Sequence, residues 1–296
     1  MTETNYRANC HCGKFVYEVT LPEPVNSGFV CNCSICHKKG YVFAFPPAGT
    51  DIRLVKGQED ELSSYEFGGK YQHKFCGTCG SALYVQPTEP GKAKGLNIRC
   101  FQGPVDVWTL KLTPFDGAAL PPAYKEPAFT DTEPTGGPIG DDPAAVYHGS
   151  CHCGAVRLAV RCKPLDQFVP GTEADMIVDC NCSIGAYRWI YPAADQVAIQ
   201  DPDNNRVFYV FGKYANYKVF CRRCGVHIGA APYPVTEEEL AALPEIARSD
   251  NALVWRERSA TRAPVNTRVL HGIEFDKLVP RRVPGYTLIQ PPYVNP

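Results

Sequence analysis

Short runs of apolar and aromatic residues, separated by glycine, proline and polar residues, recur along the chain. The clearest are KFVYEV (14–19), YVFAF (41–45), DIRLV (51–55), SALYV (81–85) and VDVWTLKL (105–112). Runs of this length, rich in β-branched and aromatic residues and in several cases bounded by Gly or Pro, are typical of β-strands. The pattern therefore predicts a mainly β protein with few helices.

One segment has the features of a helix instead, TEEELAAL from Thr236 to Leu243. Thr236 and Glu239 have the spacing of a capping box, and Pro244 follows directly after the segment. We therefore predict a short helix here, inside an insertion of the second half of the chain.

The chain carries the same plan twice. Four pairs of segments match in the same order: NCHCGKFVYEV (9–19) with SCHCGAVRLAV (150–160), CNCSIC (31–36) with CNCSIG (180–185), GKYQHKFCGTCG (69–80) with GKYANYKVFCRRCG (212–225), and NIRCFQG (97–103) with NTRVLHG (266–272). Such a series indicates a tandem duplication. We predict a first domain over residues 1–115, a Pro- and Gly-rich linker over 116–146, and a second domain over 147–296, each domain with its own core.

Composition narrows the class of protein. With 296 residues, 44% of them hydrophobic, the chain is large enough for two domains. A formal charge of -1 gives no general attraction to nucleic acid or to an anionic membrane. The polar start MTETNYRANC differs from a signal peptide, and no apolar run approaches the roughly 20 residues of a membrane span. We expect a cytoplasmic protein without nucleic-acid or membrane partners.

Fifteen cysteines in such a chain favour metal binding over disulfides. Each copy has a C-x-C pair in a predicted strand, where residues i and i+2 face the same side, and a later C-x-x-C turn. Two such pairs suit a tetrahedral zinc site, and their recurrence favours zinc over reduced core cysteines or a redox C-x-x-C. The predicted structural zinc ligands are Cys10, Cys12, Cys76 and Cys79 in the first copy, and Cys151, Cys153, Cys221 and Cys224 in the second.

The CNCSIC loop predicts a different kind of site. Cys31, Cys33 and Cys36 can supply three sulfur ligands and leave a fourth place for water or substrate, unless His37, His73 or Cys100 closes the site. Three thiolates make zinc a poorer Lewis acid than three histidines do. This favours exchange of a substrate thiolate over hydrolysis by a metal-bound hydroxide.

The second copy of this loop is incomplete. It keeps Cys180 and Cys182 and has Gly185 in the third place, so we predict a structural zinc but no working zinc in that copy. Whether Cys180 and Cys182 still bind a metal stays open. The expected total is about three zinc ions per chain.

Polar residues near the first loop are further candidates. Lys38 and Lys39 could offset its negative charge, hold a substrate carboxylate, or be ordinary surface lysines. Arg99 is a candidate for binding a carboxylate with its planar fork, the alternative being a surface arginine on a strand. The recurrence of Asn97 and Arg99 as Asn266 and Arg268 favours a structural role common to both copies. His73 could move a proton, although a buried or exposed histidine without catalytic role is commoner.

Together, the motifs CHCG, CNCSIC and FCGTCG resemble the glutathione-dependent formaldehyde-activating enzyme family, which includes centromere protein V. The resemblance covers both copies. It implies a β-rich tent fold with two zincs per domain, the structural zinc on Cys10, Cys12, Cys76 and Cys79 and the catalytic zinc on Cys31, Cys33 and Cys36. It also implies a carbon–sulfur lyase activity that joins glutathione and formaldehyde to S-hydroxymethylglutathione.

This chain departs from the single-domain pattern because it is duplicated and has lost one ligand in its second copy. We therefore expect one working site, in the first domain, that joins or releases a glutathione-like thiol and an aldehyde or other electrophilic carbon. Cys31, Cys33, Cys36 and Arg99 are the expected catalytic residues. Two alternatives remain open, a non-catalytic zinc-stabilised binding module and a pathway-specific biosynthetic lyase with a larger substrate.

Overall fold

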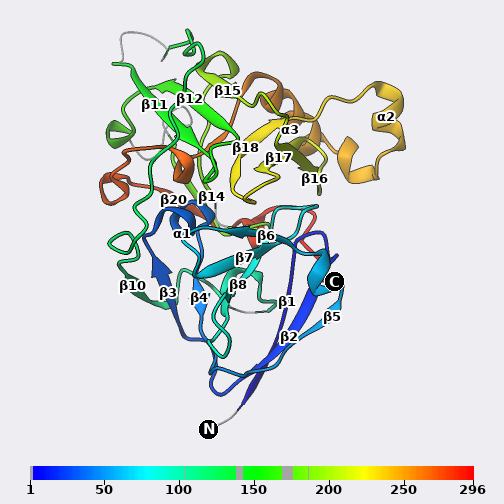
Figure 1. The fold of residues 1–296 in the computed structure, drawn as a ribbon. Coiled ribbons are helices and arrows are strands. Elements are labelled where there is room, and N and C mark those ends of the chain that lie inside the picture. Colours follow the sequence, from blue (N-terminus) through cyan, green and yellow to red (C-terminus); the bar gives the residue numbers. More distant parts are fainter. Residues whose placement is uncertain (1–2, 104, 138–142, 169–175, 186) are drawn as a thin grey trace.

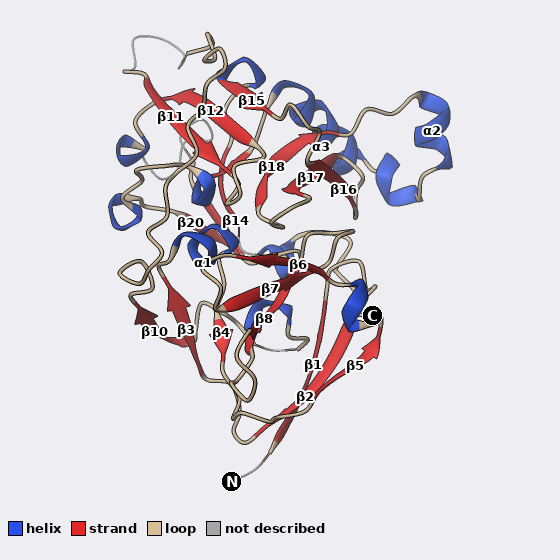
Figure 2. Cartoon of the chain, viewed as in Figure 1, coloured by secondary structure: helices blue, strands red, loops and turns tan. Residues whose placement is uncertain are grey.

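The computed structural model describes residues 3–103, 105–137, 143–168, 176–185 and 187–296. These residues form two similar sheet domains with few helices, which confirms the predicted mainly β fold (Figures 1 and 2). The strands of the first domain are β1 (Thr4–Asn9), β2 (Val16–Leu21), β3 (Ser27–Cys31), β4 (Phe43–Ala44), β5 (Ile52–Lys56), β6 (Ser63–Glu66), β7 (Tyr71–Phe75), β8 (Ala82–Pro87), β9 (Gly95–Asn97) and β10 (Lys111–Phe115).

The second domain repeats this set of strands and adds helices. Its strands are β11 (Ala145–Ser150), β12 (Arg157–Cys162), β13 (Val178–Cys180), β14 (Tyr187–Ile190), β15 (Val197–Gln200), β16 (Arg206–Val210), β17 (Asn216–Cys221), β18 (His227–Pro232), β19 (Val265–Asn266) and β20 (Arg281–Val283). The α-helices of the described residues are α1 (Ser34–Lys39) in the first domain and α2 (Glu237–Ala242), α3 (Asp250–Thr261) and α4 (Gly285–Leu288) in the second.

The two domains have the same topology. Each has a three-stranded sheet, in the order β1-β2-β5 and β11-β12-β15. Each also has a seven-stranded sheet, in the order β10-β3-β4-β9-β8-β7-β6 and, correspondingly, β20-β13-β14-β19-β18-β17-β16. In both large sheets the last strand pairs in parallel with the strand that leads into the CNCSI loop. The duplication seen in the sequence is therefore a duplication of the whole fold.

Four of the five predicted runs contain strands, namely β2, β4, β5 and β8. The prediction for residues 105–112 was largely wrong. Asp106 accepts hydrogen bonds from the backbone N–H of Trp108 with its side chain (3.0 Å) and from that of Thr109 with its carbonyl (3.0 Å). These bonds make a turn, as aspartate side chains often do, so that β10 begins only at Lys111.

Helix α2 has the predicted capping box, with the N–H of Thr236 bonded to the Glu239 carboxylate (2.8 Å) and the N–H of Glu239 to the Thr236 hydroxyl (3.1 Å). The longer helix α3 was missed. Its apolar residues Leu253, Val254 and Trp255 are consecutive and exposed, so no apolar stripe at helical spacing marks the segment. None of the helices in the described part of the chain is long and apolar enough to cross a membrane.

The expectation that each domain has its own core holds only in part, because clusters within single domains are joined by a shared one. One cluster of buried apolar residues contains Ile35, Tyr41 and Phe43 of the first domain together with Val226 and Ile228 of the second. A second cluster belongs mainly to the first domain. The two domains are therefore held against each other by a shared core.

The segments that follow each domain cross over to the other domain. Tyr124, in the predicted linker, donates its hydroxyl to the carbonyl of His152 (2.7 Å) and stacks on that ring at 4.3 Å. Tyr293, near the C-terminus, makes the same contacts with His11, at 2.7 Å and 4.6 Å. In Figure 1 the C-terminus accordingly lies beside the first domain, next to β5. The contacts are reciprocal, as in a symmetric dimer.

Candidate functional site

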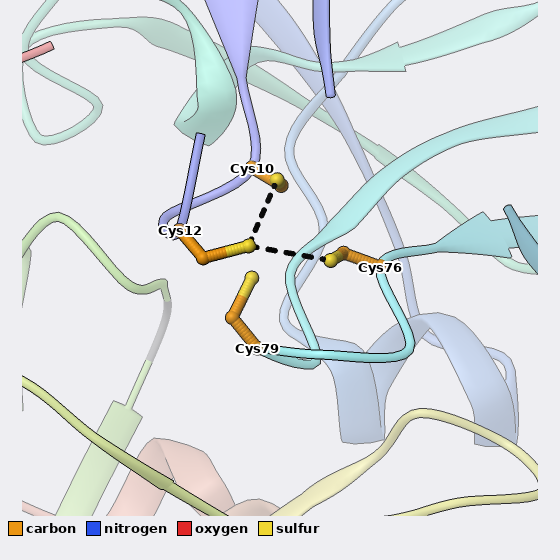
Figure 3. A group of neighbouring side chains, drawn as sticks. All are labelled: Cys10, Cys12, Cys76 and Cys79. Atoms are coloured by element: carbon orange, nitrogen blue, oxygen red, sulfur yellow. Dashed lines mark hydrogen bonds between the residues drawn. The ribbon is translucent and has the colours of Figure 1, made fainter. Parts of the chain in front are cut away.

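Four cysteines of the first domain converge on one point (Figure 3). Cys10 and Cys12 lie in the turn after β1, and not in a strand as predicted, while Cys76 and Cys79 lie in the turn between β7 and β8. The Sγ atoms of Cys10 and Cys12 are 3.6 Å apart, as are those of Cys12 and Cys76. Zinc–sulfur bonds of about 2.3 Å in a tetrahedron separate neighbouring sulfurs by about 3.8 Å, so the four thiols fit a zinc ion.

The second domain has the same group, made of Cys151, Cys153, Cys221 and Cys224. Its Sγ separations are also 3.6 Å, from Cys153 to Cys151 and to Cys221. Each C-x-x-C turn is closed by a glycine in the left-handed region, Gly80 (φ 73°) and Gly225 (φ 66°), where a side chain would be strained. Both groups could therefore hold zinc in the closed manner of a structural site.

Lys38 and Lys39 lie at the interface between the two domains. They are therefore not surface lysines, which was one of the interpretations of the sequence. Lys38 is buried and donates its Nζ to the carbonyls of Ser150 and Val269 in the second domain, both at 3.1 Å. The Nζ of Lys39 is also buried and lies 4.5 Å from the ring of Phe75. Burial lowers the pKa of both amines to about 8, and the nearby cysteines of the second domain act in the opposite direction.

These lysines balance charge across the interface. Zinc bound by four thiolates would carry a net negative charge. Lys38 bonds the carbonyl of Ser150, next to Cys151, and Lys39 Nζ lies close to Gly225, next to Cys224. The Nζ of Lys39 has no hydrogen-bond partner among the described residues, and it lines a small cavity of about 30 Å³ between the domains. A cavity of that size has room for a water molecule, which would satisfy the amine.

The third group is made of Cys31, Cys33 and Cys36, whose sulfurs all lie within 4.8 Å of one another. Cys31 ends β3, Cys33 is the N-cap of α1, and Cys36 lies in the first turn of that helix. Interaction with Cys33 and Cys36 lowers the pKa of Cys31, whereas interaction with Cys31 and Cys33, together with burial, raises the pKa of Cys36. Three thiolates this close would repel one another, so the donor set fits a metal cation that binds all three.

The candidates for a fourth ligand lie elsewhere. Among the described residues, no further His, Cys, Asp or Glu atom joins the group within 4.8 Å. The ring of His37 faces Phe275 of the second domain at 4.5 Å. His73 shares a hydrogen bond with the hydroxyl of Tyr41 (3.3 Å), and burial lowers its pKa to about 3. Cys100 donates to the carbonyl of Ala82 (3.3 Å).

The second domain forms one wall of the three-cysteine site. The hydroxyl of Ser34, the first residue of α1, shares a hydrogen bond with Nε2 of His152 (2.9 Å), and Tyr65 bonds Nδ1 of the same ring (2.8 Å). Phe275 packs against the ring of His37, the residue after Cys36, with the ring centroids 4.5 Å apart. Sequence reasoning missed His152 and Phe275, because nothing in their local sequence marks a contact with the other copy.

In the incomplete loop of the second copy, the described residues 181–185 form no counterpart of α1. Eight positions separate Cys33 from Tyr41, but only five separate Cys182 from Tyr187, which stacks on Trp189 as Tyr41 stacks on Phe43. The shorter loop leaves one ring nitrogen of His11 without a partner in the described part of the chain. His11 corresponds to His152, whose Nε2 bonds Ser34 at the start of α1. The Nδ1 of His11 bonds to Tyr209 (2.8 Å), but its Nε2 is buried without a partner among the described residues.

Arg99 and Asn97 have different roles in the structure. Asn97 caps a short 3₁₀ turn by accepting from the N–H of Arg99 (3.3 Å) and donates to the carbonyl of Ala82 (2.7 Å). Asn266 does the same in the second domain, so the repeated asparagine supports the local turn. Arg99 donates Nε to the carbonyl of Gly40, at the end of α1 (2.8 Å), and lines the same cavity as Cys182 of the other copy.

Comparison with known proteins assigns the first domain to a family. The family model described as glutathione-dependent formaldehyde-activating enzyme matches residues 5–111. A protein of Rhodobacter sphaeroides with a crystal structure is 30% identical in sequence over 36% of this chain and 99% of its own, with a TM-score of 0.32. The matched residues contain Cys10, Cys12, Cys76 and Cys79 as well as the three-cysteine loop. Through this domain, the chain belongs to the glutathione-dependent formaldehyde-activating enzyme family.

Proposed function

We propose that the chain is a zinc-dependent carbon–sulfur lyase whose one working site is formed by Cys31, Cys33 and Cys36. In the joining direction, the sulfur of a glutathione-like thiol forms a bond to the carbonyl carbon of an aldehyde. The carbonyl π-electrons move to oxygen, which takes up the thiol proton, so that the product is an S-hydroxyalkyl thioether. The reverse direction breaks the same carbon–sulfur bond.

The observation that carries the proposal is the convergence of three thiols in the domain that matches the family. A zinc ion bound there would favour the thiolate form of a substrate thiol. The chain itself supplies the position of the site, because α1 is fixed to the second domain by Ser34 and Lys38. Apolar contact of Phe275 with His37, the residue after Cys36, limits water on that side of the loop.

The remaining expectations are part of the same proposal. We propose domain bounds of 1–115 and 147–296, and three zinc ions per chain, two of them structural. All fifteen cysteines are free, which supports a reducing compartment such as the cytoplasm. The carboxylate-binding role expected for Arg99 is taken up below, because this side chain lies beside the second copy of the loop.

Elemental analysis combined with exchange spectroscopy tests the proposal. Wild type should contain about three zinc ions per chain and Cys36→Ser about two. With formaldehyde and glutathione, two-dimensional exchange NMR should show faster interconversion with the wild type than without protein, and no acceleration with Cys36→Ser. Cys100→Ser is the matched control, since it removes a thiol outside the three groups and should keep both properties.

Two results would contradict the proposal. If wild type and Cys36→Ser bind the same amount of zinc, the three-cysteine loop is not a metal site. If zinc falls as expected but a panel of thiols and aldehydes exchanges at the uncatalysed rate, the loop binds metal without this chemistry, and the protein is a zinc-stabilised binding module.

A further inference from the structure

We propose that the incomplete loop of the second copy forms a separate binding pocket for a small organic carboxylate with an apolar body. A cavity of about 400 Å³ lies at this loop, between Cys182 and Gly185 of the second domain and Arg99 and Trp108 of the first. This volume is within the range of small-molecule sites in proteins. The pocket is distinct from the three-cysteine site on α1.

The second copy lacks both the third cysteine of the loop and the helix that follows it in the first copy, and this leaves room for the pocket. Gly185 stands in the place of Cys36, and a Cβ built on it would meet no atom within 4 Å. The loop is also too short to form a counterpart of α1, whose residues pack into the interface in the first copy. The space that a metal ligand and a helical turn would fill is therefore open.

Arg99 gives the pocket its preference for an anion. The only hydrogen bond of the Arg99 side chain among the described residues is from Nε to the carbonyl of Gly40. Asp179, whose charge acts on Arg99, is paired with Arg188 at 3.5 Å, so the two terminal nitrogens of the Arg99 guanidinium remain for a ligand. These nitrogens form a fork that matches a carboxylate. The other charged group of the lining, Asp106, is exposed and already accepts the N–H of Trp108.

Apolar side chains on another part of the lining favour a ligand with an apolar body, beside the polar Asn181, Ser183 and Thr287. Trp108, Val107 and Phe101 come from the loop after β9 of the first domain, and Tyr286 comes from α4 of the second. The ring of Trp108 is held from the second domain by Arg282, whose guanidinium carbon lies 5.7 Å from the ring centroid. A ligand there would contact both domains, as cofactors and substrates often do at domain interfaces.

Isothermal titration calorimetry with two probes of the same shape tests the charge preference. We expect 1-naphthoate to bind one site per chain with a dissociation constant of about 1 mM or tighter, and the neutral 1-naphthylmethanol to bind about tenfold more weakly. Arg99→Gln should abolish this difference while still binding the neutral probe, which also shows that the variant is folded.

The chain offers two matched controls. Arg268 is the equivalent arginine of the second copy and does not line the pocket, so Arg268→Gln should keep the preference for 1-naphthoate. Thr287 lines the pocket on α4, whereas the next residue, Leu288, is 64% exposed and does not. Thr287→Trp should therefore block both probes, and Leu288→Trp should leave both unchanged.

The inference is overturned if neither probe shows saturable binding, if Arg99→Gln keeps the preference, or if Arg268→Gln loses it to the same extent. Thr287→Trp binding like the wild type would also overturn it. The outcome is independent of the proposed lyase activity, because Cys36→Ser should stop exchange and leave 1-naphthoate binding unchanged. Failure of either assay alone therefore identifies which of the two proposals is wrong.

Discussion

Two glycines that follow the large sheets lie directly against the CNCSI loops. Gly117 follows β10 and Gly285 follows β20, and a Cβ built on either one would overlap the sulfur of Cys31 or of Cys180. Neither backbone needs a left-handed conformation, so the requirement for glycine here is the closeness of the sulfur. The main chain thus forms one side of the cysteine loop in both copies.

This pair allows a test at the scale of a single methyl group. Gly117→Ala should push the Cys31 sulfur out of the three-cysteine group, lower the zinc content by about one ion per chain and abolish exchange. Gly285→Ala introduces the same clash beside Cys180 and should leave the zinc content unchanged, because two cysteines and a glycine do not form the site. Equal zinc loss in both variants, measured by elemental analysis, would show a working metal site in the second copy.

The structure brings together the three cysteine groups that the sequence spacing predicted as ligand sets, because short spacings keep thiols close in space. The role of Gly117 could not be found in that way. Its contact with Cys31 arises from the parallel pairing of β10 with β3, which is a property of the fold rather than of local sequence. The same holds for Arg99, whose side chain faces the other copy.

At the scale of elements, α1 makes the difference between the two copies. It starts at an N-cap cysteine and ends at Gly40, which adopts the left-handed conformation (φ 62°) common after helices. Between these ends, its buried face carries Ile35, Cys36 and Lys38. One short helix therefore presents a metal ligand, an apolar contact and a cation to the interface.

Lys38→Met tests how α1 is held. The substitution removes the two hydrogen bonds to the carbonyls of Ser150 and Val269 and leaves both buried acceptors without that partner, so the free energy of unfolding should fall by about 1–3 kcal/mol. Urea denaturation measures the change, with the exposed Lys70→Met as the control. A loss no larger than that of the control would mean that α1 is held by its apolar contacts alone.

The strands were easier to predict than the helices. Runs such as 81–85 alternate between the two faces of a sheet and are bounded by turn residues, and both signals are local. Helix α1 is only one and a half turns long and contains three motif positions, so its sequence shows the motif rather than a helical pattern. Helix α3 lies on the surface without an apolar stripe, and only its N-cap Ser249 marks its start.

At the scale of the whole molecule, the two similar domains pack against each other through reciprocal contacts, like the two subunits of a symmetric dimer. His11 and His152 occupy equivalent places in the two domains. Each ring is bonded by a tyrosine from a strand of the other domain, and each backbone carbonyl accepts from a tyrosine of a crossing segment. The sequence repeat predicted two domains but not this reciprocal packing, because the crossing segments are short and rich in proline and carry no apolar period. The shared core also makes independent unfolding of the domains unfavourable.

Tyr124→Phe and Tyr293→Phe test the reciprocity. Each removes one hydroxyl that donates to a buried histidine carbonyl at 2.7 Å, so each should lower the free energy of unfolding by about 1 kcal/mol. A single cooperative transition is expected in thermal unfolding of both variants. Separate transitions for the two domains, or an effect from only one tyrosine, would mean that the two crossing segments are not equivalent.

The crossing segments also set an order of events during synthesis. Tyr293 is made 282 residues after its partner His11, so the first domain gains this contact only after the second domain has been made. Tyr124, in contrast, is made before its partner His152. Domains usually fold in the order of their synthesis, but here the first domain receives its crossing segment after the second domain has received its own.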